Sequence, residues 1–163
     1  MKILVTGNAG SGKSTLSRQL AAHYGLEWYG LDTIVWKEGW QKASTVELNE
    51  QMTGLLAKSD WVIDGVSDDI LRAADQVVFL DVPRRVSFYR VAKRNWKYLF
   101  SSRPDLPVNC PEILIIPKLV KMIWCFPERV RPKILAEKQN RGGKIVHITN
   151  NRELRAYLQG LDG

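Results

Sequence analysis

Short apolar runs recur along this chain, and stretches with helical spacing separate them. Such runs are typical of strands in a parallel sheet that is covered on both faces. They predict five strands, at residues 2–6, 27–31, 61–63, 76–82 and 144–148. Helix signals between and after them predict helices at 14–24, from about 44 to 58, at 84 to about 100, and in a short stretch after Asn150. Strands that alternate with helices predict an α/β fold with a doubly wound parallel sheet.

The residues after the first predicted strand match the pattern G-x-x-x-x-G-K-[ST]. A strand, a Gly-rich turn and a helix are the context in which this pattern binds phosphate, because backbone N–H groups and the helix N-terminus point into one hollow. Lys13 is expected to reach the β- and γ-phosphates of ATP, and Ser14 to ligate Mg²⁺. The expected nucleotide-binding residues are Gly7, Ala9, Gly10, Ser11, Gly12, Lys13, Ser14 and Thr15.

Acidic residues follow three of the predicted strands, at Asp32, Asp64 and Asp81. Ligands bind outside the carboxyl ends of strands in sheets of this kind. Asp32 is expected to orient or deprotonate an acceptor hydroxyl or to hold a metal-bound water, and an N-cap role for a helix from Thr33 onward is the alternative. Asp64 is a candidate to support Mg²⁺ through water. For Asp81, a structural role in a turn explains the residue at least as well.

The net charge of +7 is concentrated in one block. Residues 84–144 hold 15 Lys and Arg against 4 Asp and Glu, whereas residues 1–83 carry a net charge of −4. Such a block favours polyanions, namely nucleotide phosphates, nucleic acid or acidic lipid, although a solvated basic face explains part of it equally well. Within the block, Arg90 and Arg94 share one face of a helix and suit bidentate contact with phosphate. Arg84 and Arg85 begin the same helix.

An irregular, proline-rich stretch is expected at residues 104–111, and a strongly apolar segment follows at 112–126. The apolar segment is too short for a membrane helix, and Pro117, Lys118 and Lys121 are expected to break it. It predicts a buried helix or a mobile lid element, with a surface that faces a partner or a membrane as the alternative.

Three tryptophans in the first half of the chain are candidates for a site or for the core, namely Trp36, Trp40 and Trp61. Trp36 and Trp40 follow Asp32 closely, so they either stack on a planar acceptor or cover the edge of a helix. Trp61 lies within a strand pattern and is expected in the core.

The overall composition is ordinary, with 163 residues, 45% of them hydrophobic and 25% charged, and it is typical of one soluble globular domain. Cys110 and Cys125 fit neither a disulfide framework nor a zinc spacing, which favours ordinary apolar side chains in a reducing compartment. The chain starts with Met1-Lys2 and reaches the glycine-rich loop at Gly7, so no targeting segment is expected. We therefore expect a cytoplasmic protein.

The residues described above give the chain a resemblance to the adenylate-kinase-like group of P-loop kinases. Over nearly its whole length the chain is most similar to the small bacterial DNA topology modulation kinases. The resemblance rests on the segments GNAGSGKST, LDTIVW, WVIDG, FLDVPRR and RVAKRN. It implies a P-loop NTPase fold, a three-layer αβα sandwich with a five-stranded parallel sheet in the order 2-3-1-4-5. It also implies a single domain over 1–163 with a basic, helical, lid-like insertion at about 84–143.

The resemblance also implies contacts at both ends of ATP. Arg90 and Arg94 stand seven and eleven residues after Pro83, the spacing of the arginines that contact ATP phosphates in adenylate kinases. Residues 150–152, after the last strand, would fall near the adenine.

The acceptor side differs from that of adenylate kinases. Two arginines that hold a monophosphate acceptor there have no counterpart here, because the third predicted strand continues as DGVSD and the second as LDTIV. An acidic residue after the second strand is more typical of kinases of small hydroxylated molecules. The usual lid loop is replaced by the proline-rich stretch and the apolar segment.

These features predict an ATP- and Mg²⁺-dependent phosphotransferase. Its catalytic residues would be Lys13, Asp32, Arg90 and Arg94, and its metal residues Ser14 and Asp64. The acceptor would be a small molecule, with nucleosides, nucleotides and sugar-like hydroxyl compounds all open.

The alternative is a nucleotide-regulated nucleic-acid-binding module that uses residues 84–144, with weak or no kinase activity. No recognised nucleic-acid motif is present, however. A GTP-binding switch would need a guanine-reading Asn-Lys-x-Asp motif, which the sequence lacks.

Overall fold

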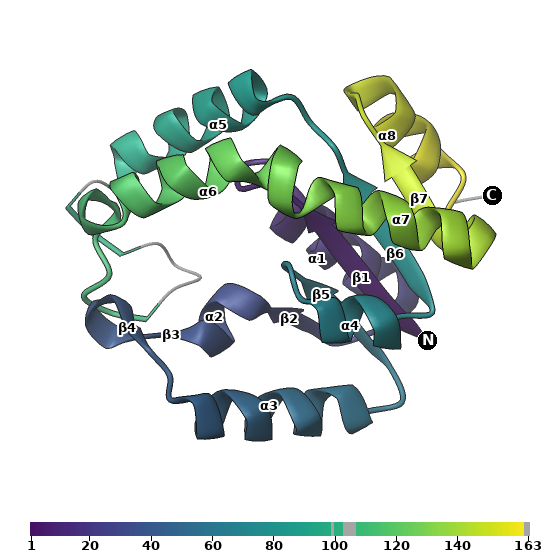
Figure 1. The fold of residues 1–163 in the computed structure, drawn as a ribbon, viewed down its shortest axis with the longest axis horizontal. Helices are drawn as coiled ribbons and strands as arrows, with labels where there is room; N and C mark the ends of the chain where they lie inside the picture. Colours follow the sequence, from purple (N-terminus) through teal and green to yellow (C-terminus); the bar gives the residue numbers. More distant parts are fainter. Residues whose placement is uncertain (99, 103–106, 162–163) are drawn as a thin grey trace.

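A five-stranded parallel sheet forms the centre of the molecule, in a computed structural model that describes residues 1–98, 100–102 and 107–161. The order of the strands in this sheet is β2-β5-β1-β6-β7 (Figure 1). Two further strands, β3 and β4, pair only with each other in an antiparallel hairpin. The strands are β1 (Lys2–Gly7), β2 (Trp28–Gly30), β3 (Trp36–Lys37), β4 (Gln41–Lys42), β5 (Trp61–Asp64), β6 (Gln76–Leu80) and β7 (Ile145–Ile148).

Helices connect the parallel strands and cover the sheet. The α-helices are α1 (Lys13–Tyr24), α2 (Leu31–Val35), α3 (Thr45–Ala57), α4 (Asp68–Ala73), α5 (Arg84–Lys97), α6 (Ile116–Arg129), α7 (Arg131–Arg141) and α8 (Asn151–Gln159). Three short 3-10 helices complete the described elements: η1 (Glu38–Trp40), η2 (Glu112–Leu114) and η3 (Gly142–Lys144). None of the helices in the described part of the chain is long and apolar enough to cross a membrane.

The sheet is the middle of three layers. On one face, α1 and α8 pack against it through Leu16, Leu20 and their neighbours. On the other face, α3, α4, α7 and the end of α6 pack against it through Leu55, Ile70 and Ile134 among others. The central strands β1, β5 and β6 are buried almost throughout, as apolar strands covered on both faces should be. The predicted α/β fold with a five-stranded parallel sheet is therefore confirmed.

The strand numbering differs from the expected order 2-3-1-4-5 because two unpredicted strands, β3 and β4, intervene in the chain. Counted within the five-stranded sheet alone, β2, β5, β1, β6 and β7 are the second, third, first, fourth and fifth strands. The predicted helix starts are well matched where a polar cap sets them. Ser44 and Glu47 form the expected capping box at α3, and Asn150 caps α8.

Several expectations about element bounds were wrong. The second strand ends at Gly30 and the fourth at Leu80, because the chain turns into α2 and toward α5 at these points. The helix predicted from residue 84 to about residue 100 is α5, which ends at Lys97 rather than near Phe100, and residue 99 lies outside the described residues. Residues 104–106 of the proline-rich stretch also lie outside them, while residues 107–111 contain no helix or strand.

The apolar segment was expected to be broken, yet it forms one helix, α6, after the short turn η2. Pro117 lies in the first turn of α6, where its missing N–H costs no helical hydrogen bond. The helix buries Leu119, Ile123 and Phe126 and exposes Val120 and Trp124 on its other side. The segment is therefore a partly buried helix, and a partner or a membrane at its exposed face stays a prediction.

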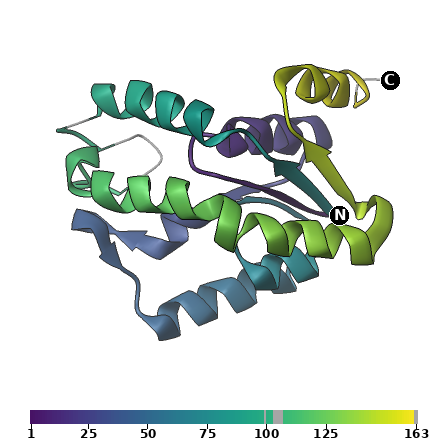
Figure 2. The ribbon, with the colours of Figure 1, turned by 45° about the horizontal axis from the view of Figure 1, so that its top comes forward.

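A third apolar cluster joins α6 to α5, which lie side by side (Figure 2). Its buried members are Val91, Ile115, Leu119 and Ile123. Trp36 and Trp40 pack against this cluster with their rings edge to face, their centroids 5.4 Å apart. Trp40 also donates a hydrogen bond from Nε1 to the carbonyl oxygen of Pro111. The two residues thus cover the edge of α6, while Trp61 is fully buried in the core as expected.

Candidate active site

The loop between β1 and α1 is held against both helices of the α5–α6 pair. The Asn8 side chain, 2% exposed, donates a hydrogen bond from Nδ2 to the carbonyl oxygen of Ile123 in the middle of α6. Gly10 has φ +73°, and a Cβ there would stand 2.8 Å from the carbonyl oxygen of Ser87 in α5. A side chain at this position would therefore force the loop away from α5. Nothing in the sequence pattern singled out Asn8 as a positioning residue.

The sheet register brings the acidic residues to the start of the same loop. Asp64 ends β5 and is paired with Val5 of β1 on one side and with Gly30 of β2 on the other. Gly65 has φ +146°, and a Cβ there would lie 2.5 Å from the Leu31 side chain, so glycine lets α2 approach the end of β5. Asp32 follows Leu31 in the first turn of α2. The N-cap position of α2 is Gly30, so the alternative of an N-cap role for Asp32 was wrong.

A cavity of about 960 Å³ opens over this loop and this edge of the sheet. It brings together most of the residues singled out in the sequence. Its lining includes Gly7, Ala9, Gly10, Gly12, Lys13, Ser14, Thr15, Asp32, Asp64, Arg90 and Arg94. Of the expected nucleotide-binding residues, Ser11 is the exception, because it is buried and does not line the cavity.

The cations near the loop already contact its backbone. Lys13 donates from Nζ to the carbonyl oxygen of Asn8 at 2.9 Å. Arg90 donates from Nη1 to the carbonyl oxygen of Ser11 at 3.1 Å, and its Nη2 lies 3.5 Å from Oδ1 of Asn151. Arg94 donates from Nε to Oδ1 of Asn95 at 3.2 Å. Two cationic side chains are therefore anchored to the carbonyl groups of the loop. Two of the loop N–H groups are also engaged, because Ala9 donates to Oδ1 of Asn8 and Ser11 donates to the carbonyl oxygen of Asn8.

Asp64 is the most buried charged group of the site, 6% exposed. Burial raises the pKa of its carboxyl, opposed by a hydrogen bond with Ser14 and by the charges of Lys13 and Arg18. The charge of Asp32 raises this pKa further. Oδ2 of Asp64 is buried and has no hydrogen-bond partner among the described residues. A buried carboxylate oxygen beside a serine hydroxyl fits a hard cation such as Mg²⁺. The described residues contain no group of three or more His, Cys, Asp or Glu side chains placed to hold a metal by themselves.

Three of the sequence candidates lie away from the cavity. Asp81 accepts hydrogen bonds at Oδ2 from Nε of Arg131 and pairs there with Nε2 of His147, each at 2.8 Å, so it ties α7 to β7. Arg84 pairs with Glu128 and lies over the Trp124 ring, and Arg85 does not line the cavity. Asp81 therefore has a structural role, although it joins α7 to β7 rather than stabilising a turn.

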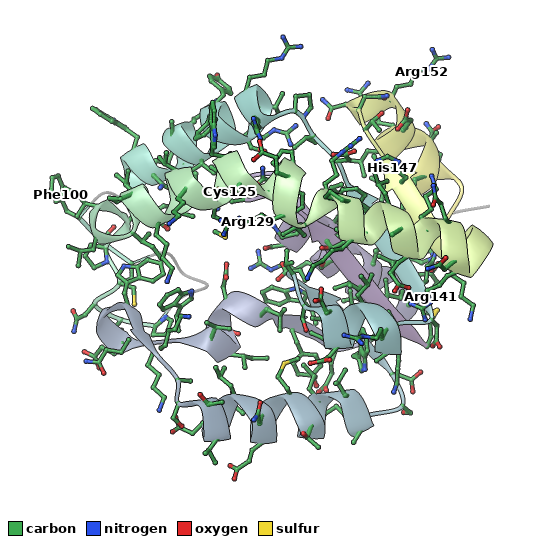
Figure 3. All side chains as sticks on the ribbon, viewed as in Figure 1. Phe100, Cys125, Arg129, Arg141, His147 and Arg152 are labelled. Atoms are coloured by element: carbon green, nitrogen blue, oxygen red, sulfur yellow. The ribbon has the colours of Figure 1, made fainter. Side chains whose placement is uncertain are left out.

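The stretch 150–152, which the resemblance placed near adenine, lies at the start of α8. The side chain of Asn150 accepts hydrogen bonds from the backbone N–H groups of Arg152 and Glu153. Figure 3 shows Arg152 at the outer edge of α8. None of these residues lines the cavity, although Asn151 approaches Arg90.

Cavity residues that the sequence reasoning missed come mainly from α6. Lys118, Lys121, Cys125 and Arg129 line it, and Figure 3 shows Cys125 and Arg129 on the edge of α6 that faces α2. These residues are spaced by three, four and four positions, which is the spacing of one helix face. The sequence therefore contained a signal that they lie on the same side of the helix. Arg18 of α1 also lines the cavity and lies over the Trp28 ring. Both cysteines are free, and Cys110 is buried, where its Sγ accepts a hydrogen bond from the N–H of Trp40 and donates one to the carbonyl oxygen of Lys37.

The chain was compared with known proteins to identify its relatives and its fold. No protein-family model matches the chain. A cytidylate kinase of Pyrococcus horikoshii is 32% identical over 108 residues, which cover 56% of this chain and 56% of that protein. An adenylate kinase of Thermococcus gammatolerans is 31% identical over 155 residues, 93% of this chain and 62% of that protein. The chain thus spans about half to nearly two thirds of the length of these relatives.

Among solved structures, a shikimate kinase from Acinetobacter baumannii in complex with shikimate matches with a TM-score of 0.53. The match covers 99% of this chain and 90% of that one at 18% identity. The chain therefore has the α/β fold of P-loop kinases, which confirms the coarser part of the resemblance. The narrower likeness to DNA topology modulation kinases stays a prediction.

The buried position of Asp64 gives a prediction about stability and pH. Because burial raises its pKa in the folded state, the folded protein binds this proton more tightly than the unfolded chain. The contribution of the Asp64 carboxyl to the stability of the fold is complete below the pKa of about 4 that it has in the unfolded chain. This contribution is lost as the pH rises through the higher pKa of the folded state. In the absence of nucleotide and Mg²⁺, Asp64→Asn should therefore raise the melting temperature at pH 8 by on the order of a few degrees.

Thermal unfolding from pH 4 to pH 8 measures this effect. The gap between Asp64→Asn and the wild type should widen as the pH rises, while Asp69→Asn, an exposed change on α4, should show a small and flat difference. A gap that stays constant across this pH range would show that the buried charge does not limit stability.

Proposed function

We propose that this chain is an ATP- and Mg²⁺-dependent phosphotransferase that passes the γ-phosphate to the hydroxyl group of a small acceptor. The observation that carries the proposal is one cavity that unites the glycine-rich loop, Lys13, Asp32 and Asp64. The kinases among its relatives, and the fold it shares with shikimate kinase, support the same class of reaction. We place 1–163 in a single kinase-like domain, with α5, α6 and α7 as a lid-like part at about 84–143, in a cytoplasmic protein.

The donor half of the site rests on the loop and its cations. Backbone N–H groups of the loop and the N-terminus of α1 hold the phosphates of ATP. Lys13 neutralises charge on the β- and γ-phosphates, and Arg90 and Arg94 stabilise the γ-phosphoryl group from α5. Ser14 and Asp64 would hold Mg²⁺, which when bound neutralises charge on the phosphate oxygens. The buried, unpartnered Oδ2 of Asp64 is the feature that fits this ion.

The transfer step needs a group at the acceptor oxygen, and Asp32 is the exposed carboxylate that lines the cavity. Asp32 accepts the proton of the acceptor hydroxyl as that oxygen forms a bond to the γ-phosphorus. The bond between the γ-phosphorus and the bridging oxygen breaks, and ADP carries the bridging oxygen away. The proton then passes from Asp32 to solvent, which the exposure of this residue permits.

Lys13→Ala should lower acceptor-stimulated ADP release by two or more orders of magnitude, because it removes charge stabilisation in the transition state. The assay follows ADP release from ATP and Mg²⁺ against a panel of nucleosides, monophosphates and small hydroxyl compounds. Lys93→Ala, an exposed lysine on α5 outside the cavity, is the matched control and should retain activity. Normal turnover in Lys13→Ala would place the chemistry elsewhere.

Asp32→Asn should lower kcat by roughly 10²–10⁴-fold while it leaves the affinity for ATP nearly unchanged, because it removes the proton acceptor and keeps the shape of the side chain. Steady-state kinetics with the best acceptor, together with titration of a non-hydrolysable ATP analogue, separate the two effects. Asp69→Asn is the control. If Asp32→Asn alters ATP affinity and spares kcat, its role lies on the donor side.

A second candidate function is binding of single-stranded nucleic acid, and the outer face of α5 favours it. Tyr89, Lys93, Trp96 and Lys97 are exposed on this helix, Trp96 by 81%, and Phe100 beyond it is equally exposed. Figure 3 shows Phe100 at the outer edge of the molecule. Aromatic rings interleaved with cations are the combination on which unpaired bases stack. In this second function, nucleotide binding in the cavity would regulate the binding of nucleic acid to α5.

The test is the binding of a fluorescent single-stranded oligonucleotide at several salt concentrations. Affinity should fall linearly on a log–log plot, with a slope that reports several phosphate contacts. Trp96→Ala should weaken binding about tenfold through the loss of one stacked base, and Arg155→Ala on α8 should not. Weak binding that neither salt nor Trp96→Ala changes would exclude this function.

A further inference from the structure

The two sides of the cavity carry opposite charge. The sheet side, formed by the ends of β2 and β5 and by α2, contributes the carboxylates Asp32 and Asp64 together with apolar side chains such as Val35 and Val66. The α6 side contributes three cations, Lys118, Lys121 and Arg129, which we call the α6 cation face. The sheet side has no cation between residues 27 and 36 or between 61 and 71. The cations that line the cavity come from α1, α5 and α6.

The position of α6 is set by its buried side chains and by one member of the α6 cation face, Lys118. Its buried side chains Leu119 and Ile123 pack toward α5, and the Ile123 carbonyl accepts the hydrogen bond from Asn8. Lys118 lies over the Trp36 ring, with its Nζ 4.0 Å from the ring centroid. Because Trp36 directly follows α2, this contact places the start of α6 over the segment that carries Asp32.

The α6 cation face carries charge that the protein itself does not balance. Within the described part of the chain, neither Lys121 nor Arg129 makes an ion pair. Burial lowers the pKa of Lys118, and the charge of Lys42 adds to this effect. In the proposed function, Lys13, Arg90 and Arg94 serve the phosphates of the donor. Lys121 and Arg129 are therefore left for a second anion, with Lys118 beside them over the Trp36 ring.

We propose that the phosphoryl acceptor is itself an anion, a small hydroxyl compound that bears a carboxylate or a phosphate group, and that the α6 cation face binds this group. The acceptor hydroxyl lies at Asp32, and the anionic group lies on the α6 side of the cavity. Arg129 offers a fork that suits either oxyanion, and the two lysines add point charges. The role of this anion as phosphoryl acceptor rests on the proposed function. The existence of an anion site on the α6 side of the cavity does not depend on that function.

The first experiment measures the anion site alone. The probe is inorganic phosphate, titrated by calorimetry into protein whose donor site is saturated with Mg²⁺ and a non-hydrolysable ATP analogue. The wild type should bind phosphate under these conditions, and the double variant Lys121→Gln/Arg129→Gln should bind it at least tenfold more weakly, because two charge-assisted contacts are lost. The double variant Lys144→Gln/Arg155→Gln removes the same charges at exposed positions outside the cavity and should bind like the wild type.

Both double variants should bind the ATP analogue like the wild type, which shows that they are folded. Equal phosphate affinity in the two double variants would overturn the proposal, and so would the absence of phosphate binding by the wild type.

The second experiment identifies the acceptor group. Related hydroxyl compounds with and without an anionic group are compared as acceptors, namely glycerol with glycerate and glycerol phosphate, and thymidine with thymidylate. The anionic members should be turned over, and Lys121→Gln/Arg129→Gln should raise their KM at least tenfold with a smaller change in kcat. The carboxylate and phosphate arms distinguish the two kinds of anion.

The outcomes separate this inference from the proposed function. Turnover that depends on Lys13 but is as fast with neutral acceptors as with anionic ones would overturn the anionic acceptor and leave the phosphotransferase intact. Phosphate binding that depends on the α6 cation face, with no Lys13-dependent turnover of any compound, would overturn the phosphotransferase and leave the anion site.

Discussion

The site depends on how the α5–α6 pair holds the glycine-rich loop, through one buried hydrogen bond and one close backbone approach. Asn8 donates to the Ile123 carbonyl, and Gly10 lies against the Ser87 carbonyl with no room for a Cβ. A buried side-chain amide that lost its partner would cost on the order of 1–3 kcal/mol. The loop and α6 are thus positioned together, so the helix that carries the α6 cation face stands at a set place over the phosphate-binding backbone.

The arrangement of charge follows from which elements supply which wall. Parallel strands bring their carboxyl ends to one edge, so Asp64 of β5 and Asp32 after β2 meet beside the loop. Cations come from helices that cross over this edge, with Arg90 and Arg94 from α5 and the α6 cation face from α6. The burial of Asp64 is unfavourable for its charged form, as the raised pKa shows. In the proposed function, a cation bound beside Asp64 would stabilise its charged form and so would link folding to metal binding.

The acceptor side is where the chain departs from what its resemblance to adenylate kinases implies. The positions after β2 and β5 carry no arginine, and the chain spans only part of its curated relatives. The α6 cation face supplies positive charge from the opposite side of the cavity. In the proposed function, donor and acceptor contacts come from separate elements, so the cavity would keep the donor geometry of the fold and recognise a different acceptor.

The sequence by itself determined the five strands of the parallel sheet, the glycine-rich loop and the acidic residues at the strand ends, because these depend on local patterns and on a short motif. Capping at Ser44 and Asn150 was equally local, and so was the core position of Trp61. Only the tertiary structure decided that Asp81 contacts Arg131 and His147 instead of lining the cavity. It also decided that residues 112–126 form a turn and one helix with cations toward the loop. These outcomes depend on contacts between residues far apart in the chain, which periodicity along the sequence does not encode.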